Sequence, residues 1–219
     1  MKTNIGWQDS PNVFKLKLLD EFLLPKKNLN VLELAAGYGW YSKYLHNKGH
    51  RVTSVDIEPH FEQEGINVIL ADLEKPIGFK NDSFDVVVVW DIIEHINNES
   101  QILNEIQRVS RENALIFISV PHVDDSRIAS SYLTYSHFKD KTHKREYTPE
   151  ELAYKFESIG FKKLKLQLEG GGSYPYIILN FIDNVFFKYC MKLFIRGLIF
   201  LGILKLKNCH GDIFAVFKK

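Results

Sequence analysis

Two glycines and two single carboxylates lie directly after short apolar segments, where side chains can reach a ligand. Gly37 and Gly39 stand in the run Glu33-Leu34-Ala35-Ala36-Gly37-Tyr38-Gly39, and residues without a side chain let the backbone turn tightly and approach a ligand closely. Asp56 lies where a carboxylate can accept both hydroxyls of a ribose. Asp72 follows the next apolar segment, where it can accept a hydrogen bond from an exocyclic amine such as that of adenine. These residues predict one ligand that contains a nucleoside.

Glu33 and the pair Trp90-Asp91 extend this set to four segment ends. The negative charge of Glu33 suits a ligand with an ammonium group, reached directly or through ordered water. Each residue alone is a weak signal, because paired glycines often mark a plain turn and a single acid often caps a helix. The prediction therefore depends on the order and spacing of all of them.

Three histidines are candidates for a base that deprotonates an acceptor. The unperturbed pKa of histidine, about 6.5, suits proton transfer near neutral pH. His95 follows Asp91 closely in the sequence, and its alternative role is a structural bond to the backbone. His137 and His143 lie in a polar, aperiodic stretch that would equally suit a solvated surface loop. Histidines and acids here lack the spacing of metal ligands in sequence, so no metal is expected.

The elements that position these residues alternate between strands and helices. We expect strands over Asn30–Ala35, Arg51–Asp56, Asn67–Ala71, Phe84–Trp90, Ala114–Val120, Phe161–Leu168 and Ile213–Phe217. Helices are expected between Ser10, as the cap, and Pro25, from the glycines to about Asn47, from Asn98, and from Thr148. This alternation predicts an α/β fold, a Rossmann-like doubly wound and mostly parallel sheet with helices on both faces. Ligands of such sheets bind beyond the carboxyl ends of the strands.

The motifs together resemble a known family. The run Val31–Gly39, then Val55-Asp56, Ala71-Asp72-Leu73, Phe84–Val87 and Glu94-His95-Ile96 are similar to those of class I S-adenosylmethionine-dependent methyltransferases. Within that class the resemblance is to the small-molecule, ubiquinone-biosynthesis-like (type 11) branch. It covers roughly residues 28 to 165. It implies a seven-stranded sheet whose last strand is antiparallel, with Asp212–Phe217 as the candidate.

The resemblance also implies which residues bind S-adenosylmethionine. The glycine turn of the family would place Glu33 and Gly37 near the methionine part of the cofactor. Ala35 replaces the first glycine of the family motif, and Gly39 is its last glycine. The resemblance likewise implies Asp56 and Ile57 at the ribose, Asp72 and Leu73 at the adenine, and Trp90 with Asp91 beside the reacting methyl group. The segment around His143 and Tyr147 resembles the substrate-side loop of these enzymes.

Two other classes of protein remain open. Gly37-x-Gly39-x-x-Ser42 approaches the fingerprint of an NAD-dependent oxidoreductase, although Ser42 replaces the third glycine, which packs helix on strand. A cofactor-binding scaffold without chemistry would keep the same fold. We expect a methyltransferase for a small-molecule acceptor, acting on oxygen of a sugar or glycan precursor, with a quinone or other lipid as the alternative.

Composition restricts the partners. The 219 residues contain 28 Lys and Arg against 27 Asp and Glu, a formal net charge of +1 that offers no reason to expect nucleic acid. Two cysteines, Cys190 and Cys209, cannot form a disulfide framework. The first residues lack the apolar run of a signal peptide, and no apolar stretch approaches the ~18 residues of a membrane span. We expect a cytoplasmic protein.

Two stretches interrupt the alternation within what we expect to be one domain over residues 1–219. The first, about 122–148, would be a substrate-side loop. The second, about 170–210, would be an aromatic helical insertion in which Lys188, Lys192 and Arg196 are spaced four apart. Its part from about 174 to 207 has three interpretations: a cap packed on the sheet, a homodimer contact, or a peripheral contact with a membrane.

Overall fold

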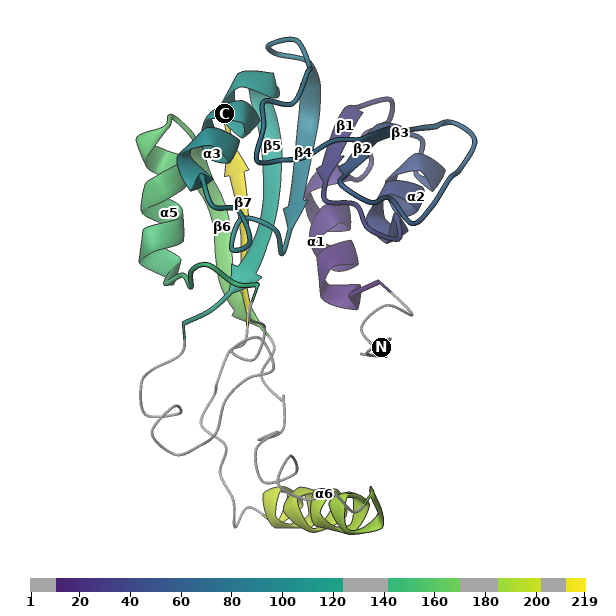
Figure 1. Cartoon of the computed structure of the whole chain (residues 1–219), viewed down its shortest axis with the longest axis vertical. Coiled ribbons are helices and arrows are strands. Elements are labelled where there is room, and N and C mark those ends of the chain that lie inside the picture. The colour runs from purple at the N-terminus through teal and green to yellow at the C-terminus, as the bar shows by residue number, and fades with distance from the viewer. Residues whose placement is uncertain (1–10, 124–141, 170–184, 202–211) are drawn as a thin grey trace.

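A single sheet of seven strands organises the computed structural model, which describes residues 11–123, 142–169, 185–201 and 212–219 (Figure 1). The strands are β1 (Asn30–Leu34), β2 (Arg51–Asp56), β3 (Ile66–Leu70), β4 (Phe84–Trp90), β5 (Ser110–Pro121), β6 (Lys162–Glu169) and β7 (Asp212–Lys218), in the spatial order β3-β2-β1-β4-β5-β7-β6. All pairs among β1 to β5 are parallel, whereas β7 pairs antiparallel with both β5 and β6. The predicted fold class is confirmed, including the antiparallel last strand.

Helices cover both faces of the sheet. Alternate residues of a strand point to opposite faces, so each buried strand contributes to two cores. Leu32 and Leu34 of β1 pack in a cluster with residues of α3 (Glu99–Val109) and α5 (Pro149–Ser158). Val31 packs on the other face with residues of α1 (Val13–Leu23) and α2 (Trp40–Asn47). The chain order reverses between β1 and β4, and this is the point at which an open α/β sheet forms its ligand crevice.

Local capping chemistry explains where three helices begin. The Thr148 hydroxyl accepts from the backbone N–H of Glu151, whose carboxylate accepts from the backbone N–H of Thr148, and this reciprocal capping box confirms the predicted start of α5. The Asn98 side chain caps α3 as expected. The expected cap of α1 was wrong: the carboxamide of Asn12 accepts from two backbone N–H groups of the first turn, and Ser10 lies outside the described residues.

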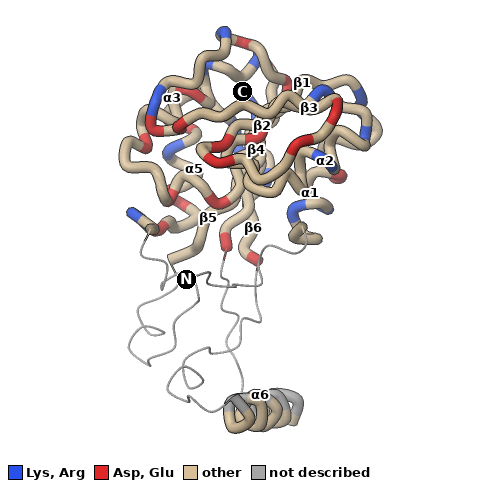
Figure 2. Tube along the Cα trace, turned by 45° about the vertical axis from the view of Figure 1, so that its right-hand side comes forward, with Lys and Arg blue, Asp and Glu red and all other residues tan. Residues whose placement is uncertain are grey.

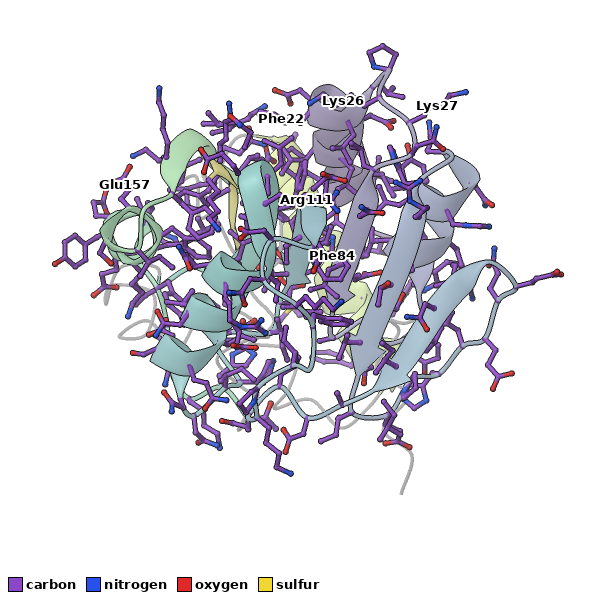
Figure 3. The ribbon with its side chains drawn as sticks, turned by 90° about the horizontal axis from the view of Figure 1, so that it is seen from above. Phe22, Lys26, Lys27, Phe84, Arg111 and Glu157 are labelled. Carbon is purple, nitrogen blue, oxygen red and sulfur yellow. The ribbon has the colours of Figure 1, made fainter. Side chains whose placement is uncertain are left out.

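The amino ends of the parallel strands are joined by hydrogen bonds and an ion pair. Figure 3 looks onto this end, with Phe84, the first residue of β4, near Arg111. The Arg111 guanidinium donates to Asp85 Oδ1 at 2.9 Å, and the Asp85 carboxylate also accepts from the backbone N–H of Asn30. These bonds tie β1, β4 and β5 together at the end opposite the predicted site.

The helix α6 (Val185–Phe200) belongs to the second interrupting stretch. It lies beyond the carboxyl ends of the parallel strands, apart from the sheet in both views (Figures 1 and 2). Exposed apolar side chains include Phe186, 76% exposed, and Phe194, 61% exposed. The side chains of Lys188, Lys192 and Arg196 lie outside the described part of the structure, as do residues 124–141 of the expected substrate-side loop. Among the helices that are described, none is long and apolar enough to cross a membrane.

Candidate active site

The loop after β1 is a bend built from left-handed residues. Ala35, Gly37 and Gly39 have φ of 56°, 52° and 69°. A Cβ atom added to Gly37 would meet nothing within 4 Å, whereas one added to Gly39 would lie 2.6 Å from the Phe61 ring. Glycine at position 39 is therefore required by packing inside the protein. Glycine at position 37 leaves open space, which is what a bound nucleoside cofactor needs at this bend.

Hydrogen bonds bring the bend and the predicted ribose acid together. The Gly37 N–H donates to Asp56 Oδ2 at 2.7 Å, and the Glu58 N–H donates to Asp56 Oδ1 at 2.8 Å. Ile57, between Asp56 and Glu58 in the sequence, is 67% exposed, so its side chain is available to a ligand. Each oxygen of Asp56 keeps further lone pairs for a hydroxyl donor.

Asp72 lies next to this pair because β2 and β3 are neighbours. The Ala71 N–H donates to the Asp56 carbonyl oxygen at 2.9 Å, which joins the two strand ends. The Asp72 carboxylate accepts from the Glu74 N–H and pairs with Lys75, and these bonds hold its pKa below the ordinary value. Leu73 is only 6% exposed and packs in the core, so its side chain does not face the crevice. Only the backbone of Leu73 is available to an adenine.

Glu33 is buried below the bend on the face covered by α1 and α2. Its side chain is 2% exposed, and its carboxylate accepts a short hydrogen bond from the Ser42 hydroxyl of α2. Burial raises the pKa of Glu33 to about 7. An ammonium group of a ligand placed nearby would favour the ionised carboxylate, because opposite charges lower the pKa of an acid.

A buried lysine at the end of β4 was not anticipated from the sequence. Lys15 of α1 is 6% exposed, pairs with Asp91, and lies 5.3 Å from the centre of the Trp90 ring. Burial alone would lower the pKa of Lys15, but the Asp91 carboxylate raises it above its ordinary value. Lys15 stands three and four positions before Leu18 and Leu19, and that spacing on the apolar face of the helix was the signal that could have revealed it.

Trp90 is less accessible than expected for a group beside a cofactor. Its side chain is 6% exposed, and its ring packs edge-on against Tyr41, Phe117 and Phe214. Asp91, the next residue, has a φ of 51° and accepts from the Ser119 hydroxyl as well as from Lys15. Trp90 is therefore a buried ring at the end of β4, and the Lys15–Asp91 ion pair places its ammonium group over that ring.

The turn after Asp91 brings Glu94 and His95 against His143. The His95 and His143 rings have centroids 4.7 Å apart, and the Thr142 hydroxyl lies 2.9 Å from His95 Nδ1. Glu94 is fully buried, and both of its carboxylate oxygens lack a hydrogen-bond partner among the described residues. Burial, together with the Asp91 carboxylate, raises the pKa of Glu94 to about 8. The two predicted catalytic histidines thus share one site.

Tyr147, predicted together with His143, belongs to the core of the protein. Tyr147 is 1% exposed and donates to Glu99 Oε1 at 2.7 Å, so it is a core residue that anchors the segment before α5. His137, the third candidate base, lies outside the described residues.

Acidic positions are frequent around the labels β2 and β4 in Figure 2, and basic positions are interspersed over the rest of the body. The strand ends thus combine a glycine bend with open space, two half-buried carboxylates and a buried glutamate. A histidine pair lies at one end. Such an arrangement fits a nucleoside with a positively charged extension, held beside a group that can activate an acceptor hydroxyl.

The chain belongs to a methyltransferase family. The family model described as "Methyltransferase domain" matches residues 11–166, which include the bend, both strand-end acids and the histidine pair. This match confirms the methyltransferase predicted from the sequence and favours it over the oxidoreductase. No curated protein matches the chain.

Solved structures show the same fold at low identity. A SAM-dependent methyltransferase from Archaeoglobus fulgidus is 18% identical, with a TM-score of 0.65 over 94% of this chain and 93% of that one. An S-adenosylmethionine-dependent methyltransferase from Mesorhizobium loti is 13% identical, with a TM-score of 0.62 over 94% and 97%. The 1,6-didemethyltoxoflavin-N1-methyltransferase of Burkholderia thailandensis, solved with bound 1,6-didemethyltoxoflavin and S-adenosylhomocysteine, is 17% identical, with a TM-score of 0.60 over 94% of this chain and 76% of that one.

Proposed function

We propose that this methyltransferase moves the methyl group of S-adenosylmethionine to an oxygen atom of a small molecule, with a sugar or glycan precursor as the first acceptor class. The observation that carries the cofactor assignment is the 2.7 Å bond from the Gly37 N–H to the Asp56 carboxylate. It joins the bend with open space to the predicted ribose acid, and Asp72 lies two residues past the end of the neighbouring strand β3. The membership of the small-molecule, ubiquinone-biosynthesis-like branch stays a prediction.

The residues of the chain then have separate tasks. S-adenosylmethionine supplies a methyl group on a sulfonium: the acceptor oxygen would form a bond to the methyl carbon while the carbon–sulfur bond breaks, and S-adenosylhomocysteine would leave with that electron pair. Asp56 would accept the ribose hydroxyls, Asp72 the adenine amine, and Glu33 would face the ammonium group. His95 or His143 would take the proton of the acceptor hydroxyl, since both lie past the end of β4. Orientation of the reacting groups supplies much of the acceleration in such a displacement.

Calorimetry with S-adenosylhomocysteine and with NAD tests the cofactor assignment. We expect S-adenosylhomocysteine to bind and NAD not to bind. The substitution Asp56→Asn should weaken the binding of S-adenosylhomocysteine. Binding of NAD alone would contradict the proposal. A screen of acceptors with labelled cofactor then separates an enzyme from a scaffold, because a scaffold would show no turnover. The preference for sugars depends on analogy with the loop around His143.

The exposed helix α6 favours a quinone or other lipid as the second acceptor class. Phe187, Tyr189 and Phe194 are 56%, 62% and 61% exposed on one helix. Large apolar side chains at the surface mark interaction sites, and aromatic ones suit the boundary of a lipid layer. We propose peripheral contact of α6 with a membrane. Co-sedimentation with anionic vesicles tests this contact, and protein that stays in the supernatant would contradict it. A dimer that forms with increasing protein concentration would indicate that α6 is a homodimer contact instead.

We further propose that residues 1–219 form one methyltransferase domain with two excursions, at about 122–148 and 170–210. Two-state thermal unfolding followed by two probes would support a single cooperative unit. Two separate transitions would contradict it.

A further inference from the structure

Three potential metal ligands meet at the end of β4, although they are far apart in the sequence. Glu94, His95 and His143 each offer a ligand atom, and these atoms all lie within 4.8 Å of one another. Ligands of a tetrahedral ion with bonds of about 2.1 Å are about 3.4 Å apart. The farthest pair therefore needs to close by at most about 1.4 Å, which side-chain rotation can supply. An ion is thus geometrically accessible to all three.

The buried carboxylate of Glu94 points to a cation independently of this distance. Glu94 is 0% exposed, and neither carboxylate oxygen has a hydrogen-bond partner in the described part of the chain. Buried carboxylates are normally hydrogen-bonded or paired with a charge, because an isolated one is costly. Among the described charged groups that act on Glu94, Lys15 is paired with Asp91, and Asp212 is a further acid.

The segment that carries His143 is held against the turn that carries His95. The Lys144 N–H donates to the Glu94 carbonyl oxygen at 2.7 Å, and Arg145 donates to the Asn97 carbonyl oxygen at 3.0 Å. The Thr142 hydroxyl at His95 Nδ1 leaves Nε2 of that ring as the ligand atom. A second hydrogen bond on the ring is the usual way in which a protein orients a histidine ligand. The backbone segments that carry the three ligands are therefore held together, and only the side chains need to rotate to reach an ion.

We propose that Glu94, His95 and His143 bind a divalent transition-metal ion, with Zn²⁺ as the reference ion. Two imidazoles and one carboxylate favour Zn²⁺, Fe²⁺ or Ni²⁺ over Mg²⁺, which prefers oxygen ligands. Three protein ligands leave a coordination position for a further group, as in zinc sites that act on substrates. This inference replaces the expectation of a metal-free protein, because only the folded chain brings His143 to the other two.

The site deepens the proposed function and rests on it for its role. An acceptor hydroxyl at the open coordination position would have a lowered pKa, as a water molecule bound to Zn²⁺ does, and would release its proton to solvent more readily. Its oxygen, which keeps the electron pair, would then be the nucleophile for the methyl group. The ion would thus do what the proposed function assigns to one imidazole alone.

Titration of the tag-free chain with ZnCl₂, after removal of metals with a chelator, tests the site. We expect one equivalent to bind, with the dissociation constant raised tenfold or more by Glu94→Gln and by His143→Ala. The control is His46→Gln on the last turn of α2, which should leave the dissociation constant unchanged. Zn²⁺ should raise the Tm of the wild type and not that of Glu94→Gln, and the visible absorption of a Co²⁺ complex should be lost in both cluster variants.

Absence of a stoichiometric Zn²⁺ site, or equal affinity in the wild type and both cluster variants, would overturn the proposal. Tighter binding of Mg²⁺ than of Zn²⁺ would overturn the choice of ion class. Binding of S-adenosylhomocysteine is measured on the same metal-free samples. If it persists without a metal site, only the metal inference fails. If Zn²⁺ binds and S-adenosylhomocysteine does not, only the proposed function fails.

Discussion

Replacement of Gly37 by alanine separates a ligand-binding role of the bend from a purely structural one. Gly37 has a φ of 52°, and an added Cβ would meet nothing within 4 Å. In the free protein, Gly37→Ala therefore introduces backbone strain without a clash. In the complex, the added methyl group would stand where the cofactor needs to approach the backbone.

The expected cost to folding is small. A left-handed conformation costs a residue other than glycine about 1–2 kcal/mol. Alanine also restricts the unfolded chain, which returns about 0.4–1 kcal/mol. The free energy of unfolding should therefore fall by about 1 kcal/mol, within reach of urea denaturation.

The expected cost to binding is larger. A displacement of the ligand that removes even one hydrogen bond of about 1.4 kcal/mol raises a dissociation constant tenfold. We expect the dissociation constant for S-adenosylhomocysteine to rise at least about tenfold in Gly37→Ala. Isothermal titration calorimetry on the folded variant measures it.

Gly160, which follows α5, supplies a matched control. Its φ is 97°, and an added Cβ would also meet nothing within 4 Å, but it lies outside the crevice. Gly160→Ala should lose comparable stability and keep the affinity of the wild type. Equal affinity of Gly37→Ala and the wild type would refute the assignment of the bend, as would an equal loss in both variants.

Three further predictions concern stability. Ala35→Gly should raise the free energy of unfolding by about 1 kcal/mol in urea denaturation, because Ala35 has a φ of 56°; an unchanged or lower value would refute strain at this residue. Glu33 has a folded pKa of about 7 against an ordinary value of 4.5, so the folded state holds its proton more tightly and loses about 3 kcal/mol of stability as pH rises from 4.5 to 7. Glu33→Gln should flatten this part of the pH profile, and an unchanged slope would contradict the shift. Lys15→Met and Asp91→Asn should each destabilise the fold, and their double-mutant cycle should show a coupling of about 1–2 kcal/mol; additive effects would show that the buried pair is not coupled.

The sequence alone was sufficient for features that depend on neighbouring residues. The continuous β-branched run of β4, the capping residues Asn98 and Thr148, and the glycines of the bend are local signals. Each depends on backbone conformation or on hydrogen bonds within a few residues. Asp56 and Asp72 were found because parallel strands place their carboxyl ends at one edge, which makes position along the chain a guide to position in space.

Only the tertiary structure decided which distant side chains meet at that edge. Lys15 contacts Asp91 across 76 positions, and Glu94 and His95 meet His143 across almost fifty. Such contacts depend on how α1 packs on the sheet and on how the segment before α5 is held against the turn after β4. Hydrophobic periodicity and turn residues do not predict that packing, because each describes a single element and not its contacts with other elements. The same limit explains why the burial of Trp90 and Leu73 could not be predicted from the sequence, whereas the strand that ends at Trp90 and the strand that precedes Leu73 could.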